Sequence, residues 1–240
     1  MKPDKSIFPN SLTSLNLLAG ILGIVCALDG APDRAFFLML AAAGFDFFDG
    51  MVARALGVPP TVGKELDSLA DVVSFGVLPA VLLMSTMKGL GAAFPYFYLP
   101  LILAPMSALR LARFNVDTRQ SENFLGVPTP TSAMLCASLC LFIAENPGTL
   151  PHRWAATPWF LPLVALGLGL LLLSEIPMFG MKAGKGHKLM DAKRVAFLLG
   201  AALSIAAALL LKGSWSLAVL LVFGLYVVEN LILYLLPTKR

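Results

Sequence analysis

Long hydrophobic runs separated by short polar stretches dominate this sequence of 240 residues. A run of about 20 apolar residues is long enough to cross the hydrocarbon core of a bilayer as a helix. We therefore expect an all-α fold, a polytopic transmembrane helical bundle with about eight spans. Gly, Pro or charged residues interrupt several runs, so a core of six spans with two weaker additions is the alternative. The predicted spans lie near residues 12–29, 35–56, 69–87, 93–114, 130–146, 157–175, 192–211 and 214–236.

The composition supports a membrane protein. Hydrophobic residues make up 58% of the chain, charged residues only 13%, and the mean hydropathy is +0.82. A soluble domain usually contains about a quarter charged residues. There is no Ser/Gly-rich linker and no obvious internal repeat. We expect residues 1–240 to form a single integral-membrane domain.

The distribution of basic residues predicts the orientation of these spans. Cytoplasmic loops of membrane proteins carry an excess of Lys and Arg. With eight spans and a cytoplasmic N-terminus, all but four of the 18 basic residues lie on the cytoplasmic side, the exceptions being Arg34, Lys88, Arg153 and Lys212. This indicates a cell (inner) membrane protein with both termini in the cytoplasm. The net charge of +4 then reflects this topology and anionic headgroups, and no nucleic acid partner is expected.

Four aspartates within 26 residues are the main candidates for chemistry. Carboxylates at membrane depth are costly, so a cluster of them suggests a functional site. Asp46 and Asp49 are spaced i,i+3, and Asp67 and Asp71 are spaced i,i+4, so each pair shares one face of a helix. Two such helices facing each other would form an oxygen-rich pocket for hard divalent cations, Mg²⁺ or Mn²⁺, rather than Zn²⁺.

The residues around these aspartates suit a phosphate-containing ligand. Gly50 removes a side chain where a nucleotide must approach the helix backbone, and Ala53 keeps the same face small. Arg54 can hold phosphate oxygens in a bidentate manner. Two cations sharing carboxylates can stabilise both the attacking and the leaving oxygen in phosphoryl transfer. The structural alternative is that Asp and Arg side chains here only satisfy one another.

The spacing of these residues matches a known signature at every fixed position. It reads Asp46-x2-Asp49-Gly50-x2-Ala53-Arg54-x8-Gly63-x3-Asp67-x3-Asp71. In this the chain resembles the CDP-alcohol phosphotransferase family. The segment from Pro9 to Asn16 also resembles the opening helix of that family.

The resemblance implies a role for each matching position. It implies two metal ions, Mg²⁺ or Mn²⁺, with Asp46, Asp49 and Asp67 as ligands. Asp71 would be a further ligand, near the second ion, and would also act as the general base. The resemblance also implies a homodimer. The residues expected to line the CDP part of the donor are Asn16, Thr13, Gly50, Ala53 and Arg54.

Three further blocks bear on the acceptor alcohol. Residues 63–80, 108–115 and 124–130 resemble the phosphatidylserine synthase branch of the family, which favours L-serine as acceptor and CDP-diacylglycerol as donor. Arg110 and Arg113, spaced i,i+3, could grip a phosphate or the serine carboxylate, or could be positive-inside anchors. Lys64 and Lys185 (with its neighbours Lys182 and Lys188) face the same two interpretations.

The expected reaction is the transfer of a phosphatidyl group to serine. The serine hydroxyl, deprotonated by Asp71, would attack the β-phosphorus of CDP-diacylglycerol, giving phosphatidylserine and CMP. The same chemistry with glycerol 3-phosphate, inositol phosphate or choline is the nearest alternative. A remote alternative is an ion- or proton-coupled transporter, but such sites lie near the bilayer midplane. The charges here fall at the predicted cytoplasmic ends of the spans.

Two polar features inside the spans have less specific interpretations. Cys136 and Cys140 share a helix face without a neighbouring His, so we expect them to be packing residues. Glu229 and Asn230 interrupt the last hydrophobic run, and we expect a helix–helix contact or a dimer interface there.

Overall fold

The computed structural model describes residues 5–59, 62–117, 124–178, 192–210 and 214–235. The N-terminal half contains α1 (Ile7–Leu28), α2 (Pro32–Leu56), α3 (Val62–Asp71), the π-helical segment η1 (Val72–Val77), α4 (Leu78–Gly89), the 3-10 segment η2 (Tyr96–Ile102) and α5 (Leu103–Val116). The C-terminal half contains β1 (Phe124–Leu125), α6 (Thr129–Glu145), α7 (Leu150–Ala155), α8 (Phe160–Leu173), β2 (Pro177–Met178), α9 (Ala192–Leu210) and α10 (Trp215–Leu235).

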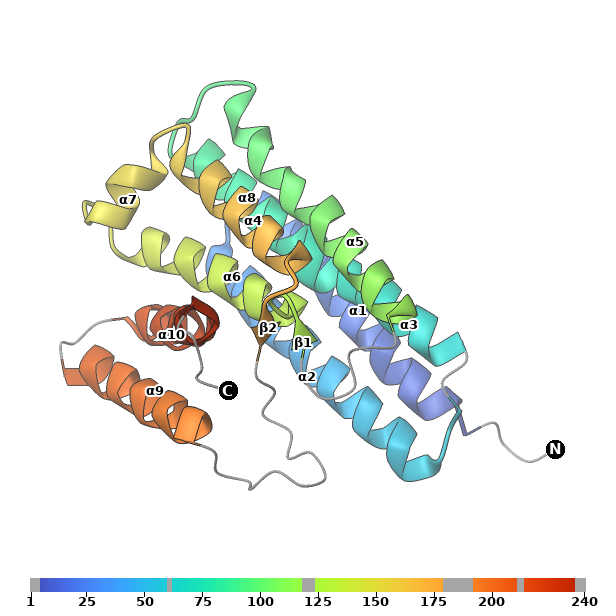
Figure 1. Ribbon diagram of the computed structural model, residues 1–240. Helices are drawn as coiled ribbons and strands as arrows, with labels where there is room; N and C mark the ends of the chain where they lie inside the picture. Colours follow the sequence, from blue (N-terminus) through green and yellow to red (C-terminus); the bar gives the residue numbers. More distant parts are fainter. Residues whose placement is uncertain (1–4, 60–61, 118–123, 179–191, 211–213, 236–240) are drawn as a thin grey trace.

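The helices from α1 to α8 form an elongated bundle, and α9 and α10 lie together beside α6 (Figure 1). Short connections make consecutive helices antiparallel neighbours. Gly30, with a φ of +73°, turns the chain between α1 and α2, which pack along each other. Gly57, with a φ of +64°, ends α2 shortly before α3 begins.

The apolar helices confirm an all-α membrane protein. Five segments are long and apolar enough to cross a bilayer: Ile7–Leu28, Pro32–Leu56, Val62–Gly89, Tyr96–Val116 and Trp215–Leu235. Three shorter apolar helices, Thr129–Glu145, Phe160–Leu173 and Phe197–Ala208, coincide with the remaining predicted runs. The count of eight spans and the cytoplasmic placement of the termini stay predictions. The sequence did not predict α7, η1, η2 or the two-stranded pair.

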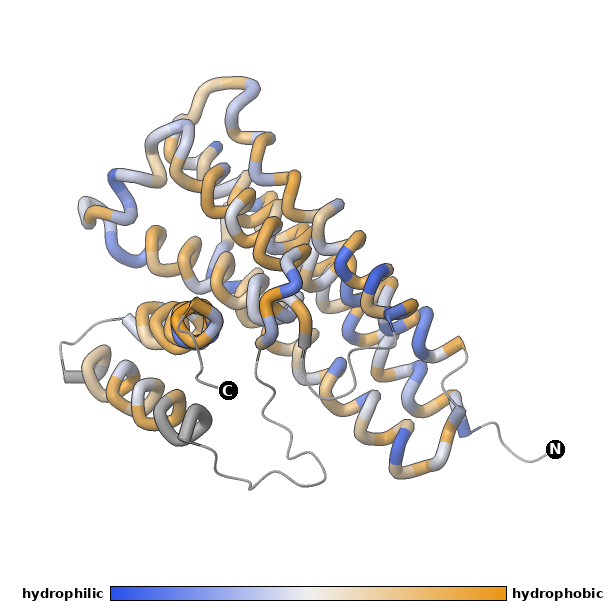
Figure 2. Tube along the Cα trace, viewed as in Figure 1, coloured by the Kyte–Doolittle hydropathy of each residue, from blue (hydrophilic) through white to orange (hydrophobic). Residues whose placement is uncertain are grey.

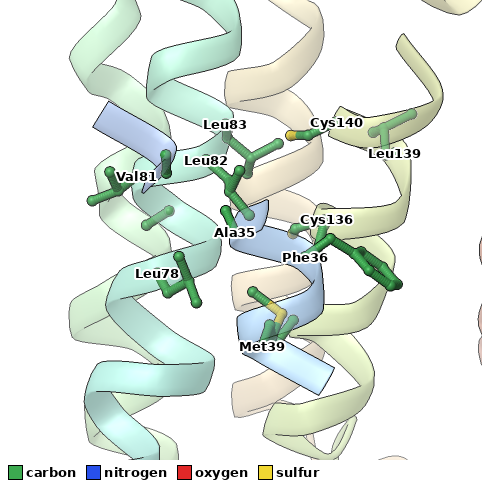
Figure 3. Close-up of a cluster of buried hydrophobic side chains, with 14 of the residues drawn as sticks. Ala35, Phe36, Met39, Leu78, Val81, Leu82, Leu83, Cys136, Leu139 and Cys140 are labelled. Carbon is green, nitrogen blue, oxygen red and sulfur yellow. The ribbon is translucent and has the colours of Figure 1, made fainter. Parts of the chain in front are cut away.

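The main core lies between α2, α4 and α6 (Figure 3). Phe36 and Met39 of α2 and Leu83 of α4 are fully buried there. Cys136 and Cys140 of α6 are also fully buried in this core, in agreement with their predicted packing role. Burial of large side chains without voids is what fixes the helices relative to one another.

The third apolar segment is not a uniform α-helix, because η1 separates α3 from α4 directly after Asp71. Gly20 of α1 allows this segment to approach closely, since a Cβ there would lie 2.4 Å from Ser74 Oγ. Ser74 Oγ in turn donates a 3.0 Å hydrogen bond to the carbonyl oxygen of Asn16. Such π-helical turns are frequent at functional sites. Here the turn places Asp71 at a junction held against α1.

A short antiparallel pair connects the regions on either side of the α6–α8 segment. Phe124 pairs with Met178, and Leu125 pairs with Pro177. The following turn requires a glycine, because Gly126 has a φ of +73° and a Cβ there would lie 2.5 Å from the carbonyl oxygen of Leu172. This turn fixes the point at which α6 begins.

Candidate active site

Hydrophilic residues gather at the end of the bundle near the N-terminus, where α2 ends, α3 begins and α5 ends (Figure 2). Asp46 and Asp49 of α2 face Asp67 of α3 there, and one ligand oxygen from each lies within 4.8 Å of the others. Asp49 is 5% exposed, whereas Asp46 and Asp67 are half-buried. The helical spacing therefore placed the two carboxylate-bearing faces correctly.

Asp71 is held separately from these three carboxylates. Its side chain is 9% exposed and accepts a 3.2 Å hydrogen bond from Asn16 Nδ2. It lies within electrostatic range of Asp46, Asp49 and Asp67 but is not one of the converging group. Its role as a metal ligand stays a prediction. Asp71 lies beside the three converging carboxylates, and the hydrogen bond from Asn16 of α1 orients its side chain. This position suits the predicted role of general base.

Thr13 and Asn16 of α1, which were predicted to contact the nucleotide, form hydrogen bonds to two of the aspartates. Thr13 Oγ1 donates a 2.6 Å hydrogen bond to Asp49 Oδ2 and is 3% exposed. Asn16 is fully buried and contacts Asp71 as described above. Charge-assisted hydrogen bonds of this kind fix the orientation of a carboxylate. Thr13 also lines the adjacent cavity, so a contact to CDP stays a prediction for both residues.

A cavity of about 310 Å³ opens beside the carboxylates between α1, α2 and α3. It is lined by Pro9, Asn10, Thr13, Asp49, Gly50, Ala53, Arg54, Val58, Pro59, Gly63, Lys64 and Asp67. A Cβ at Gly50 would lie 3.3 Å from Arg54 Nη1, so the glycine lets the guanidinium lie close to the helix. The cavity falls at the lower end of the size range of small-molecule sites. Four of the five residues predicted to line the CDP moiety lie in its wall, namely Thr13, Gly50, Ala53 and Arg54, whereas Asn16 does not.

The carboxylate group fits divalent cations. The Oδ1 atom of Asp67 is buried and has no hydrogen-bond partner among the described residues. Ligand oxygens of Asp46, Asp49 and Asp67 lie within 4.8 Å of one another. Carboxylates that converge away from water repel one another, so their convergence is costly unless a cation joins them. An all-oxygen donor set is the type that Mg²⁺ and Mn²⁺ prefer.

The two predicted arginines occupy different environments. Arg110 is 8% exposed, donates a 2.9 Å hydrogen bond from Nη1 to Thr129 Oγ1, and lies within electrostatic range of Asp71. Arg113 is exposed and lines a separate small cavity of about 50 Å³ with Arg110. Arg110 therefore lies inside the bundle and Arg113 on its surface, and a role of either in binding phosphate or serine stays a prediction.

The predicted lysines are less informative. Lys64 is exposed, lines the larger cavity, and donates a 3.0 Å hydrogen bond to the carbonyl oxygen of Asn115. This bond ties the start of α3 to the end of α5. Lys185, together with Lys182 and Lys188, lies outside the described residues.

Sequence reasoning missed one residue that supports the site. Ser74 of η1 donates a hydrogen bond from its hydroxyl to the carbonyl oxygen of Asn16. This contact has no local sequence signal, because it joins segments that are far apart in the chain.

The chain is similar in sequence to known proteins over most of its length. The profile of the CDP-alcohol phosphatidyltransferase family matches residues 6–176. A CDP-diacylglycerol--serine O-phosphatidyltransferase of Mycobacterium leprae is 40% identical over 181 residues, which are 72% of this chain and 58% of that protein. An archaetidylserine synthase of Methanothermobacter thermautotrophicus is 40% identical over 152 residues, 59% of this chain and 63% of that protein.

In a further relative, the aligned region covers a larger share of that protein's own length. A CDP-diacylglycerol--serine O-phosphatidyltransferase of Helicobacter pylori J99 is 33% identical over 174 residues, 71% of this chain and 70% of that protein. The chain thus spans less than two thirds of the mycobacterial relative and somewhat more of the Helicobacter one. All of the signature aspartates fall within the region that the family profile matches. The chain belongs to the CDP-alcohol phosphatidyltransferase family.

Proposed function

We propose that this protein transfers the phosphatidyl group of CDP-diacylglycerol to the hydroxyl of L-serine, giving phosphatidylserine and CMP. The observation that carries the proposal is the convergence of Asp46, Asp49 and Asp67 beside a cavity that contains Arg54, with Asp71 held next to them. The names of the relatives support serine as the acceptor.

The cavity between α1, α2 and α3 is the proposed site of the CDP moiety. Arg54 has a planar fork of donors that matches the oxygens of a pyrophosphate. Gly50 and Ala53 leave the helix surface free of bulky side chains where the nucleotide would lie. Lys64 of α3 adds a second positive charge to the lining of the cavity.

The three converging carboxylates are the proposed metal ligands, with Asp71 as a further ligand of the second ion. When bound there, two divalent cations, Mg²⁺ or Mn²⁺, supply charge stabilisation to the phosphoryl oxygens as the reaction proceeds. Thr13 contributes indirectly, because its hydrogen bond fixes which oxygen of Asp49 faces the group. A hydrogen bond from a neighbouring side chain fixes the orientation of a carboxylate that binds a metal ion.

Asp71 is the proposed general base. The serine hydroxyl gives its proton to the Asp71 carboxylate while the serine oxygen forms a bond to the β-phosphorus. The bond between that phosphorus and the oxygen of CMP breaks, and CMP leaves with the electron pair. Asn16 keeps the carboxylate in place, and Arg110, within electrostatic range of Asp71, is suited to hold the serine carboxylate.

The cellular setting follows from the charge distribution. The acidic cluster lies at the ends of the helices that the positive-inside pattern assigns to the cytoplasm. We propose that the active site faces the cytoplasm from the inner membrane, where CMP and serine are soluble and both lipids stay in the bilayer. We also propose a homodimer.

An alcohol-resolved assay tests the proposal. The purified full-length protein in lipid nanodiscs is incubated with CDP-diacylglycerol and Mg²⁺ or Mn²⁺, and CMP release is measured with serine, glycerol 3-phosphate, inositol phosphate or choline. We expect CMP release only with serine, and phosphatidylserine in equal amount by mass spectrometry. CMP release with glycerol 3-phosphate and not with serine would refute the acceptor assignment.

A further inference from the structure

A second polar cavity lies between the ends of α5 and α8, apart from the cavity proposed for the donor. It has a volume of about 50 Å³, and its wall contains two basic and two acidic residues, Arg110, Arg113, Asp117 and Glu175. We propose that this cavity binds the charged end of the acceptor amino acid, with Arg110 holding the carboxylate and Glu175 holding the ammonium group. The inference rests on the proposed function, which it deepens by assigning the ammonium group of the acceptor to a residue.

The cavity lies level with the proposed general base. Asn115 Nδ2 of α5 donates a 2.8 Å hydrogen bond to Ser68 Oγ of α3. Further along the same pair of segments, a Cβ at Gly76 of η1 would lie 3.1 Å from Ser107 Cβ of α5. Asp71 lies between Ser68 and Gly76, and the two arginines of the cavity lie between Ser107 and Asn115. The arginines are therefore within about one helical turn of Asp71 along the bundle, roughly 5 Å.

Arg110 has donors left for a ligand at the inner end of the cavity. Its side chain is 8% exposed, yet within the described part of the chain its guanidinium donates one hydrogen bond, from Nη1 to Thr129 Oγ1 at 2.9 Å. A guanidinium carries five N–H donors in one plane. Buried donors without partners are costly, and a carboxylate can accept two of them at once. The carboxylate of an amino acid is therefore a fitting partner for this side chain.

Glu175 lies at the mouth of the cavity, where it is exposed, in a segment that the fold holds in place. The backbone N–H of Gly126 donates a 2.9 Å hydrogen bond to the carbonyl oxygen of Ile176. On the other side of Glu175, the N–H of Val127 donates a 3.1 Å hydrogen bond to the carbonyl oxygen of Leu171. The last residues of α8 also line the cavity, and a helix C-terminus carries a partial negative charge. Glu175 and this helix end together suit an ammonium group.

The four charged residues make the cavity neutral overall, as a zwitterionic amino acid is. Asp117 is spaced i,i+4 from Arg113 and is suited to neutralise it, which leaves Arg110 and Glu175 for the substrate. A phosphorylated alcohol would bring a doubly negative group close to Glu175, and choline would bring no carboxylate for Arg110. Mismatched charges of this kind reject the wrong partner.

The size of the cavity also fits the charged end of an amino acid. One water molecule requires about 10–15 Å³ of such space, so a cavity of about 50 Å³ has room for roughly four non-hydrogen atoms. The carboxylate and the ammonium nitrogen fill this space. The hydroxymethyl group of serine then lies outside the cavity, on the side of Asp71.

The test removes one charge from the protein and one from the acceptor. Glu175→Gln keeps the size of the side chain and removes its charge, and 3-hydroxypropanoate is serine without the ammonium group. Glu65→Gln is the matched control, because Glu65 of α3 is also exposed but lines neither cavity. CMP release by the full-length variants in nanodiscs is measured with each acceptor. We expect Glu175→Gln to lower kcat/KM for serine by about tenfold, as for a lost hydrogen bond between charged groups, and to leave the value for 3-hydroxypropanoate unchanged.

A merely structural role of Glu175 would give a different pattern. If its carboxylate only paired with an arginine of the protein, Glu175→Gln would lower kcat/KM for both acceptors by the same factor, and that result would overturn the proposal. A kcat/KM for serine equal to that of the wild type would overturn it as well. The KM for CDP-diacylglycerol should change by less than about twofold, because this cavity shares no lining residue with the donor cavity.

A binding measurement separates this inference from the proposed function. Saturation-transfer NMR detects weakly bound serine without CDP-diacylglycerol and without turnover. We expect a serine signal with the wild type and with Glu65→Gln, and a weaker signal with Glu175→Gln. If the wild type binds serine in this way but releases no CMP with it, the proposed function fails while the assignment of the cavity stands. Equal signals from all three proteins, or no signal from the wild type, would overturn the inference.

Discussion

The contact between α1 and η1 leads to a sharp prediction for Gly20→Ala. A Cβ at this position would lie 2.9 Å from Ser74 Cα, a backbone atom that cannot rotate away. Carbon atoms prefer separations of about 3.5–4.0 Å, so α1 and η1 must separate by roughly 0.5–1 Å. Two hydrogen bonds cross this contact, from Ser74 Oγ to the Asn16 carbonyl at 3.0 Å and from Asn16 Nδ2 to Asp71 at 3.2 Å. Both should lengthen beyond useful range.

The expected cost combines three effects. Overpacking of a tight contact costs about 1–3 kcal/mol. Each weakened hydrogen bond costs about 1 kcal/mol more, and replacing a helical glycine by alanine returns roughly 0.5–1 kcal/mol. The net destabilisation should be about 2–4.5 kcal/mol, which lowers the unfolding temperature of a protein of this size by about 4–18 °C. The rate of CMP release should fall even at temperatures where the variant is fully folded, because Asp71 loses the hydrogen bond that orients it.

Thermal unfolding in detergent and CMP release at a temperature well below the transition measure the two effects separately. Gly44→Ala is the matched control, because Gly44 lies within α2 and a Cβ there meets no atom within 4 Å. That variant should be as stable as the wild type or slightly more stable. If Gly20→Ala matched Gly44→Ala in both measurements, the contact between α1 and η1 would not be what positions Asp71.

Three further predictions concern the chemistry directly. Asp71→Asn should lower CMP release by about 10²–10⁴-fold with an unchanged unfolding temperature, and near-normal turnover of the folded variant would exclude Asp71 as the base. Removal of divalent metal with EDTA should abolish CMP release, and added Mg²⁺ or Mn²⁺ should restore it. Asp67→Asn should require a higher metal concentration than the wild type for the same activity. Activity that persists in EDTA would contradict the metal assignment. Arg54→Lys should raise the KM for CDP-diacylglycerol by about tenfold and leave the KM for serine unchanged, since lysine lacks the bidentate fork, whereas a selective rise for serine would assign Arg54 to the acceptor side.

The sequence was sufficient for those parts of the structure that depend on local periodicity. Hydropathy predicted the apolar helices because a bilayer requires long apolar segments with their backbone bonds satisfied internally. Helical spacing was enough to predict that Asp46 and Asp49 would share a face and meet Asp67.

Tertiary contacts decided the rest. The i,i+3 spacing of Arg110 and Arg113 led to the same prediction for both, a contact to phosphate or serine or an anchoring role. In the structure, however, Arg110 is buried and Arg113 is exposed. The difference arises because the face of α5 that carries Ser107 and Arg110 packs against η1 and α6, which no pattern within α5 reveals. The separation of Asp71 from the other carboxylates has a similar origin. It lies at the start of a π-helical turn that depends on the neighbouring glycine of α1.

The division of the site between parts of the chain bears on how such a protein can evolve. Every residue that lines the cavity proposed for the donor lies between residues 9 and 67. The side chains that contact Arg110 come instead from α5 and α6, namely Phe114 and Thr129. Under the proposed assignment of Arg110 to the acceptor, mutations in these later helices would alter which alcohol is used without disturbing that cavity. An ancestral chain could change its lipid product through its C-terminal half while its first three helices stayed under constant selection.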